Sequence, residues 1–399
     1  MNRREILKGG AITLSGMLMA NTALARRRKS SMKHFIFIRL GGGATQFELW
    51  DPKPGQMNGG PTKGLKTKIA GRQFSEYLPG LTEISNQMAI VHTTSRIGEH
   101  MLGTYYTGSG GFAPSPVLKY PGMCSVIGWG LYNDNNDLPP VVSMGGGLTA
   151  GFLGNSFDPY QAGGDMSLAV SGMYRKGVEK GDNMREQYHK VSPLSKADDY
   201  QEEVKHAKRS SRLSLGISNK ALDISGESDK TKEAYGNGFG EQCLKARRLI
   251  MAGVPAIHLQ LGGWDMHRNV FEGCANKIPA MDQAISMLVK DLKAMDVFDK
   301  TMIMVSGEFG RTPRINNDEG RDHWPRNTPV TLISGAFKKG MVVGDSGPDG
   351  TAVNNMVSFG ALSYSVYKMM GVNPKGWFED IQGRPLRYCP SDVGIEGLA

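Results

Sequence analysis

The stretch Met302-Ile303-Met304-Val305-Ser306-Gly307-Glu308-Phe309-Gly310-Arg311 decides the fold. Its first four residues are apolar without alternation, which predicts a short strand buried on both faces of a sheet. Polar residues begin where this strand ends, and open α/β sheets bind ligands at that edge. The segment Gly320-Arg321-Asp322-His323 follows shortly afterwards and adds a second carboxylate and a histidine. The sequence therefore predicts a polar site at the carboxyl end of the strand.

Predicted strands and helices alternate along the rest of the chain. Besides 301–306, strands are expected at 34–40, 88–92, 138–144, 255–261 and 329–334. Helices are expected at 233–252, 278–295 and 353–370, and the second of these repeats apolar residues at steps of three and four. We expect glycine-rich loop at 145–164 and, at 374–388, loop whose aromatic residues dock on the body. The alternation predicts an α/β fold with a mostly parallel central sheet flanked by helices.

Two further polar pairs follow predicted strands. Asp265 and His267 come just after the strand 255–261, and Asp322 and His323 follow the opening stretch. Aspartate, glutamate and histidine are good ligands for zinc, manganese or iron, and a bound metal can activate water or stabilise an oxyanion. Each pair also has a purely structural interpretation: a hydrogen-bonded pair at 265–267, a salt bridge between 308 and 311, and an orienting pair at 322–323.

The glycine run Gly41–Gly43 follows the first predicted strand. Its spacing is not that of a dinucleotide-binding loop, and no helix pattern follows it. We interpret it as a loop that lets the backbone approach a ligand, with Glu48 and Asp51 as candidate ligands. For either residue, a solvated loop acid or a helix cap is the alternative.

Hydroxyl side chains gather after the strand 88–92. Thr93, Thr94 and Ser95 precede an expected helix, and His100 lies close by. A helix amino terminus favours an anion, so a nucleophile is expected among these hydroxyls. The alternative is that Thr94 or Ser95 is an ordinary helix cap.

Composition excludes several classes of protein. The 399 residues are 39% hydrophobic with 53 glycines and no triplet period, so neither global disorder nor a collagen-like fibre is expected. The net charge is +9, but no basic stripe interleaves with aromatic residues, so nucleic acid is not expected as a partner. The 4 cysteines form no C-x-x-C pair, which excludes a zinc ribbon and leaves disulfides and buried free thiols both open.

The amino terminus is typical of a targeting segment. Residues 1–25 carry Arg3-Arg4, a weakly apolar stretch and the cleavage pattern Ala23-Leu24-Ala25. This pattern predicts export by the twin-arginine translocase to the periplasm or the outside of the cell. A basic linker, 26–32, then leads into one domain, 33–399, with a charged helical insertion at about 173–222. No later run is long and apolar enough to span a bilayer, so no membrane span is expected in the mature protein.

Rival catalytic motifs fail on inspection. Gly344-Asp345-Ser346-Gly347-Pro348 lacks one glycine of the trypsin-type serine loop, and the matching Ala-His-Cys stretch is missing. The sequence contains no G-x-S-x-G elbow, no Cys-x-Pro-x-Arg sulfatase motif and no P-loop.

The motifs together resemble those of the exported bacterial proteins grouped as "domain of unknown function 1501". That family is similar to the alkaline phosphatase-like superfamily of phosphatases, sulfatases and phosphoglycerate mutases. The resemblance spans nearly the whole chain and rests on the twin-arginine signal and on the segments Gly41–Gly43, Trp50–Pro54, His100, Thr107-Gly108, Gly263–His267, Glu308–Pro313 and Gly320–His323.

This resemblance implies an alkaline phosphatase-like fold and one or two divalent ions, zinc or manganese. Asp265, His267 and His323 would hold one ion, and Glu308, a hydroxyl from 93–95 and either Glu48 or Asp51 would serve the other. The superfamily carries Asp-His where this chain has Glu308-Phe309. The candidate catalytic residues are therefore Ser95, Thr94 and Arg311, the candidate metal ligands are Asp265, His267, His323, Glu308, Glu48 and Asp51, and His100 and Asp322 are further site residues.

Two functions are compatible with these residues. The first is an exported metal-dependent hydrolase of phosphate or sulfate esters, with a small-molecule or polymer ester as substrate. The second is a non-catalytic exported binding or surface-assembly protein that reuses the fold with a degenerate site, and Phe309 motivates it.

Overall fold

The computed structural model describes residues 30–132, 138–154, 157–162, 218–379 and 384–398. The predicted signal segment 1–25 and the first residues of the basic linker lie outside the described residues. So does the helical insertion predicted at 173–222, apart from helix α7 (Ser218–Leu222). A search of the described ranges finds no helix with the length and apolar character that a membrane crossing requires.

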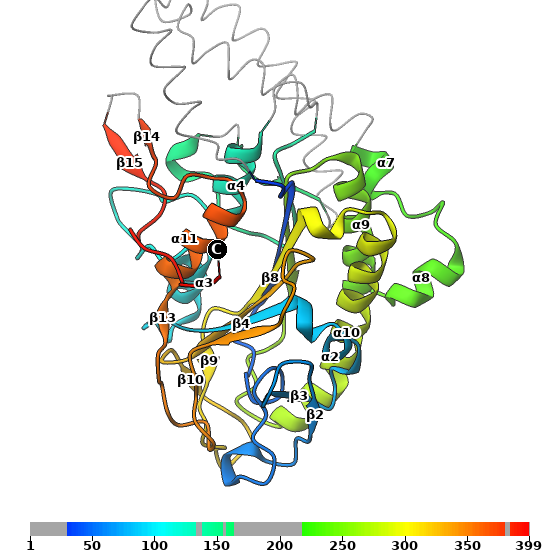
Figure 1. Cartoon of the computed structure of the whole chain (residues 1–399), viewed down its shortest axis with the longest axis vertical. Coiled ribbons are helices and arrows are strands. Elements are labelled where there is room, and N and C mark those ends of the chain that lie inside the picture. Colours follow the sequence, from blue (N-terminus) through cyan, green and yellow to red (C-terminus); the bar gives the residue numbers. More distant parts are fainter. Residues whose placement is uncertain (1–29, 133–137, 155–156, 163–217, 380–383, 399) are drawn as a thin grey trace, which may run out of the picture.

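A nine-stranded sheet forms the centre of the molecule (Figure 1). Its strands follow the order β12-β4-β11-β8-β1-β7-β5-β6, and β13 also pairs with β4. The bounds are β1 (His34–Leu40), β4 (Met88–Thr94), β5 (Val141–Met144), β6 (Tyr160–Gln161), β7 (Ala256–Leu261), β8 (Thr301–Ser306), β11 (Thr328–Ile333), β12 (Met341–Val343) and β13 (Val357–Ser358). All pairs are parallel except those of β11, which runs antiparallel to both β4 and β8. The predicted α/β class with a mostly parallel sheet is confirmed.

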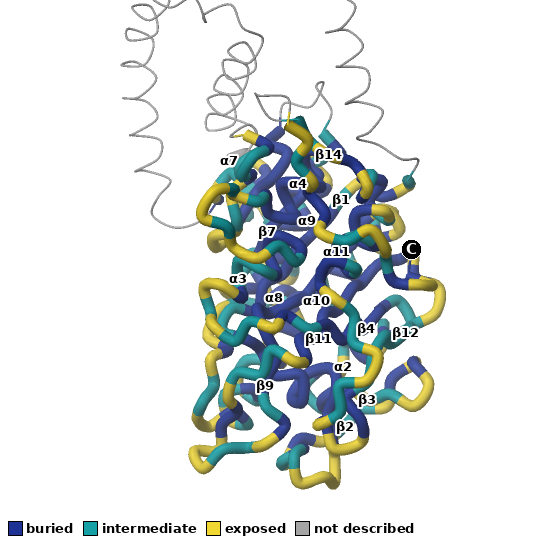
Figure 2. Tube along the Cα trace, turned by 90° about the vertical axis from the view of Figure 1, so that its left-hand side faces the viewer, coloured by how far each residue is buried: buried dark blue, intermediate teal, exposed yellow. Residues whose placement is uncertain are grey.

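Helices cover both faces of the sheet. Successive side chains of β1 point to opposite faces, so Ile36 and Ile38 join one core while Phe35 and Phe37 join the other. One core packs against α2 (Pro79–Glu83), α8 (Asp229–Tyr235), α9 (Phe239–Ala252) and α10 (Val270–Ala294). The other packs against α4 (Met123–Leu131) and α11 (Phe359–Met369). Burial on both sides explains the unalternating apolar runs of the strands, and the central elements are the buried ones in Figure 2.

Three small two-stranded sheets lie outside the central one. They pair β2 (Gly64–Lys66) with β3 (Gln73–Ser75), β9 (Gly310–Arg311) with β10 (His323–Trp324), and β14 (Trp377–Glu379) with β15 (Pro385–Arg387). The last pair corrects the prediction that 374–388 is loop throughout. Its neighbour Tyr388 is fully buried, whereas Trp377 is half exposed.

Two predicted helices have different bounds. The helix expected at 233–252 is broken, because Gly236 and Gly238 adopt φ values of +79° and +61° between α8 and α9. The helix expected at 353–370 begins only at Phe359, since Ser358 caps it by accepting a hydrogen bond from the amide of Ala361 at 3.1 Å. The helix expected at 278–295 starts earlier, at Val270, and keeps Pro279 inside it.

The region after β4 also differs from the prediction. Thr93 and Thr94 belong to β4, and helix α3 (His100–Gly108) starts later. Its cap is Glu99, whose carboxylate accepts from the amides of Met101 and Leu102, and neither Thr94 nor Ser95 caps it. All four cysteines are buried free thiols in the structure.

Gly42 holds the loop after β1 against the loop after β7. Its φ is +112°, and a Cβ built there would lie 2.5 Å from the amide nitrogen of Asp265. Gly42 also donates its amide to Glu308 Oε1 at 2.8 Å. A residue with a side chain would therefore be strained and would push the Asp265 loop away.

We expect Gly42→Ala to lower the free energy of unfolding by at least about 2 kcal/mol, because it combines a left-handed backbone with a backbone clash. The matched control is Gly71→Ala, where φ is +72° and nothing lies within 4 Å of the added Cβ. Urea unfolding monitored by circular dichroism measures both variants. Equal losses in the two would contradict the close approach at Gly42.

Candidate metal centre

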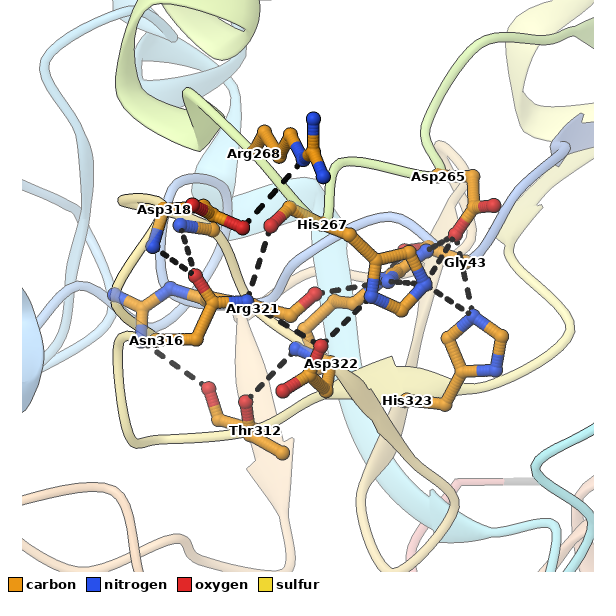
Figure 3. Close-up of polar contacts among 12 residues, drawn as sticks. Gly43, Asp265, His267, Arg268, Thr312, Asn316, Asp318, Arg321, Asp322 and His323 are labelled. Carbon is orange, nitrogen blue, oxygen red and sulfur yellow. Dashed lines mark hydrogen bonds and ion pairs between the residues drawn. The ribbon is translucent and has the colours of Figure 1, made fainter.

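Four chain segments meet at one edge of the sheet. Strands β1, β7 and β8 are parallel, so the loops that follow them start at the same edge, and β11 begins there because it runs the opposite way. These loops carry Asp265 and His267 after β7, Glu308 and Arg311 after β8, and His323 before β11; helix α3 adds His100. Figure 3 shows the imidazoles of His267 and His323 turned toward the carboxylate of Asp265.

Each of the three histidines is oriented by an acceptor at Nδ1. Nδ1 of His323 faces the carbonyl oxygen of Gly98 at 2.7 Å, and Nδ1 of His267 faces Asp322 Oδ1 at 2.7 Å. Nδ1 of His100 faces Glu308 Oε1 at 3.0 Å. Since none of these oxygens can donate, each Nδ1 carries the hydrogen, so the neutral form of each imidazole has its lone pair on Nε2. Acceptors of this kind orient metal-binding histidines in proteins.

The Nε2 atoms converge on Asp265. Asp265 Oδ1 lies 3.0 Å from His267 Nε2 and 3.2 Å from His323 Nε2, and the two Nε2 atoms are 3.0 Å apart. His100 Nε2 approaches the other carboxylate oxygen, Oδ2, at 3.4 Å. Ligand atoms of His100, Asp265 and His323 all lie within 4.8 Å of one another. Two ligands of a tetrahedral zinc ion are about 3.3 Å apart, so these separations suit a single small cation.

Arg311 fixes the Asp265 carboxylate. Its side chain is 1% exposed, and Nη2 donates to Asp265 Oδ1 at 2.7 Å. Burial alone would raise the pKa of the Asp265 carboxyl, but the hydrogen bonds and charge of Arg311, with His323 and His267, lower it to about 2. Arg311 was predicted as a catalytic residue; the structure places it beneath the carboxylate, with its donors also committed to the carbonyl oxygens of Gly43 and Arg321.

The charges and exposure of the cluster suit a divalent cation. Three carboxylates (Asp265, Glu308 and Asp322) lie around two buried guanidiniums, Arg311 bonded to Asp265 and Arg39 close to Glu308, which leaves one negative charge beside the imidazoles. The converging side chains of His100, Asp265 and His267 are 38%, 46% and 43% exposed, so an ion or a small molecule from solvent can reach them. Two lone pairs facing each other across 3.0 Å repel unless a cation or a proton lies between them. The residues therefore fit a divalent metal.

Glu308 and Phe309 lie behind the cluster. Glu308 was predicted as a metal ligand, but its Oε1 accepts from Gly42 and faces His100 Nδ1, so it supports the His100 ring from the rear. Phe309 is buried, with its ring centroid 5.1 Å from that of His100 and 4.2 Å from that of His323.

Glu48 and Asp51 each have a cationic partner elsewhere. Glu48 and Arg321 are both fully buried and form an ion pair at 2.8 Å. Asp51 pairs with Lys53 at 2.7 Å and accepts from the hydroxyl of Ser346, in the glycine-rich segment 344–348. No contact in the described ranges joins either carboxylate to the histidine cluster, and the structure therefore does not bring these two predicted ligands to it.

The hydroxyls of Ser95 and Thr93, two of the three predicted candidates, are also engaged elsewhere. Ser95 is 1% exposed, and its hydroxyl donates to the carbonyl oxygens of Ile97 and Pro325 at 3.2 and 3.5 Å. The hydroxyl of Thr93 donates to Thr328, and the backbone of Thr94 pairs with Ser358. Among the described residues, no hydrogen bond links Ser95 or Thr94 to the histidine cluster.

Sequence reasoning missed two groups that support the site. The Gly98 carbonyl, which orients His323, carries no signal because any residue offers a carbonyl. Arg39 is a buried arginine close to Glu308, and its signal was present: it is a charged residue inside the apolar strand of 34–40.

These observations define an α/β protein with a histidine–carboxylate cluster at the sheet edge where its parallel strands end. The chain belongs to the family described as "Protein of unknown function (DUF1501)", whose model matches residues 32–396. The family expected from the sequence motifs is thereby confirmed. No curated protein matches the chain.

Several solved structures are similar to this one. The lipoteichoic acid synthase LtaP from Listeria monocytogenes matches with a TM-score of 0.40 and 9% identity, over 92% of this chain and 75% of that one. The soluble domain of lipooligosaccharide phosphoethanolamine transferase A from Neisseria meningitidis matches with a TM-score of 0.39 and 10% identity, over 87% and 90%. Alkaline phosphatase from the Antarctic bacterium TAB5 matches with a TM-score of 0.35 and 11% identity, over 79% and 95%.

Asp322 offers a direct test of how the cluster is oriented. We expect Asp322→Asn to weaken divalent-metal binding by about 10- to 100-fold, because the charged acceptor that fixes the His267 ring is replaced by a neutral and weaker amide oxygen. Competition with a chromophoric chelator measures the affinity. The control is Asp318→Asn, an exposed carboxylate that forms an ion pair with Arg268 at 3.5 Å, and it should bind metal as the wild type does.

The lowered pKa of Asp265 leads us to expect that the stability of the metal-free protein depends on pH. Its folded pKa of about 2 is below the ordinary value of 3.8, so its ionised form stabilises the fold above about pH 4, and this contribution is lost as the pH falls toward 2. We expect the free energy of unfolding of the wild type to fall more steeply over that interval than that of Asp265→Asn. Urea unfolding at a series of pH values with a chelator present tests this. Parallel profiles would mean that Arg311 does not hold an ionised carboxylate.

Proposed function

We propose that this protein is an exported metal-dependent hydrolase of phosphate or sulfate esters. One observation carries the proposal: three imidazoles, each with Nδ1 tied to an oxygen acceptor, turn their Nε2 atoms toward the carboxylate of Asp265. Such an arrangement requires several supporting groups. Arg311 Nη1 lies 3.5 Å from His267 Nε2, but the Nε2 atoms of His100 and His323 have no side-chain donor with a fixed hydrogen among the described residues, which is costly unless a cation is held there.

The residues of this chain have distinct roles in the proposed site. His100, His323, His267 and Asp265 would hold the ion. A divalent metal supplies Lewis-acid polarisation of a phosphoryl or sulfuryl oxygen and stabilises developing negative charge. Arg311 and Asp322 hold the carboxylate and one imidazole in place, so that little reorganisation is needed during the reaction.

The donor set favours zinc over manganese. Imidazole nitrogen suits zinc, whereas manganese prefers sites richer in oxygen. The exposed rim of the cluster would admit either a small ester or the end of a polymer. The twin-arginine pattern at Arg3-Arg4 supports export to the periplasm or beyond, with the twin-arginine translocase as partner during that step.

A second function is favoured by a separate observation. The hydroxyl of Ser95 is buried and committed to backbone carbonyls, and Phe309 stands where the superfamily carries a histidine. Both features are compatible with an exported binding or surface-assembly protein that holds a metal without turnover.

Hydrolysis of an aryl phosphate and an aryl sulfate by purified, zinc-loaded protein separates the two. For a hydrolase, His323→Ala and His100→Ala should each lower kcat/KM by at least about 100-fold, because each removes a ligand. The matched control is His34→Ala: His34 lies at the start of β1, and its Nδ1 bonds to the Val254 carbonyl oxygen.

Elemental analysis of the same preparations gives the metal content. Bound zinc without turnover on any ester would favour the binding protein. Turnover that survives both histidine substitutions would contradict the proposed site.

A further inference from the structure

Arg39 is a buried cation without a hydrogen-bonded carboxylate. It lies near the end of β1, is 3% exposed, and donates through Nη2 to the Thr104 carbonyl oxygen at 3.3 Å. Its Nη1 has no partner among the described residues, and its guanidinium carbon lies 5.4 Å from the ring centroid of Phe37. Burying a guanidinium costs several kcal/mol unless a nearby charge compensates it.

Glu308 is the matching buried anion. It is 2% exposed, and its Oε1 is shared by the Gly42 amide and His100 Nδ1. Its second oxygen, Oε2, has no partner in the described part of the chain. The charge on Glu308 is therefore satisfied by hydrogen bonds on one side only.

The other titratable groups near Arg39 do not compensate its positive charge. Burial lowers the pKa of its guanidinium, and the Glu308 carboxylate is the main charge that opposes this. The thiol of Cys124 is neutral because burial raises its pKa to about 12. His258 is neutral because burial and the charge of Arg39 lower its pKa to about 3. Glu308 is the one carboxylate, among the described residues, whose charge stabilises Arg39.

Helix α3 covers both groups through glycines. A Cβ at Gly108 would lie 2.8 Å from Arg39 Nη2, and one at Gly103 would lie 3.2 Å from Glu308 Cβ. The same helix carries His100 in its first turn. The side chains of Arg39 and Glu308 thus lie beneath helix α3, and the imidazole of His100 on this helix points at Asp265.

We propose that Arg39 is a positioning residue of the metal centre, compensating the buried charge of Glu308 and so holding His100 with its Nε2 toward the ion. This inference rests on the proposed metal centre and adds the residue that fixes its third imidazole. Arg39 touches neither the ion nor the substrate, and acts only through Glu308 and His100.

Metal affinity of the full-length protein, measured by zinc competition with a chromophoric chelator, tests the inference. Arg39→Gln should weaken zinc binding by about 10- to 100-fold, since the charge that supports the His100 ligand through Glu308 is lost. Arg39→Lys keeps the charge and should stay within about threefold of the wild type. The visible spectrum of bound cobalt should change in Arg39→Gln and not in Arg39→Lys, because the ligand field reports the His100 ring.

A double-mutant cycle tests whether Arg39 affects zinc binding through His100. If Arg39 acts through His100, Arg39→Gln should have no further effect on zinc affinity in a His100→Ala background. Unchanged affinity in Arg39→Gln, or effects that multiply in the double variant, would overturn the inference. The matched control is Arg247→Gln: Arg247 is 8% exposed and paired with Glu227 and Asp291, so its loss should lower stability and leave zinc affinity unchanged.

The pairing of Arg39 with Glu308 can still be tested if Arg39→Gln fails to fold. If Arg39→Gln does not fold, combining it with Glu308→Gln should restore folding, because both buried charges are then removed together; lack of rescue would refute the pairing. Zinc binding without ester hydrolysis in the wild type would reject the hydrolase and leave this inference intact. Ester hydrolysis by the wild type, together with unchanged zinc affinity in Arg39→Gln, would support the hydrolase and reject this inference.

Discussion

The guanidinium of Arg311 joins the loops that build the site. It donates to the Gly43 carbonyl oxygen at 2.7 Å in the loop after β1, to Trp264 at 3.3 Å and Asp265 at 2.7 Å after β7, and to Arg321 at 2.9 Å before β11. Gln46 binds the backbone of Arg311 from both sides, with its amide on the carbonyl oxygen and its own carbonyl on the amide. A planar group with five donors can hold this many oxygens at fixed angles, which a lysine could not.

Buried charge is concentrated at this edge of the molecule. Arg311, Arg321, Glu48, Glu308 and Arg39 are all nearly inaccessible to water, although buried ions are expensive. Among the described residues, charges less deeply buried than these also lie elsewhere, at Asp282 in α10 and Arg247 in α9. Charges of this cost, set beneath half-exposed imidazoles, are characteristic of sites where side chains must be held in one orientation.

The sheet could be predicted from the sequence because its strands are buried on both faces and therefore read as unbroken apolar runs. The site edge could be predicted because Asp265 and Glu308 both follow parallel strands. Local sequence pattern could not show that Glu48 and Asp51, predicted as metal ligands, have other partners. Those partners, Arg321 and Ser346, are distant in sequence. The role of His100 depended on where α3 begins, and that start is set by Glu99 in place of the earlier hydroxyls.

The antiparallel ribbon of β9 and β10 ties His323 to Arg311 by backbone pairing. Side chains alternate between the two sides of such a ribbon, so a slip of one residue would carry the His323 imidazole to the opposite side. The turn between the two strands, residues 312–322, has an exposed stretch at 317–319, where a loop would ordinarily tolerate insertions and deletions. Here its length is constrained, because Asn316 binds the His267 carbonyl oxygen and buried Arg321 pairs with Glu48. An added or missing residue that shifted the pairing would remove one imidazole from the cluster without altering any of the histidines themselves.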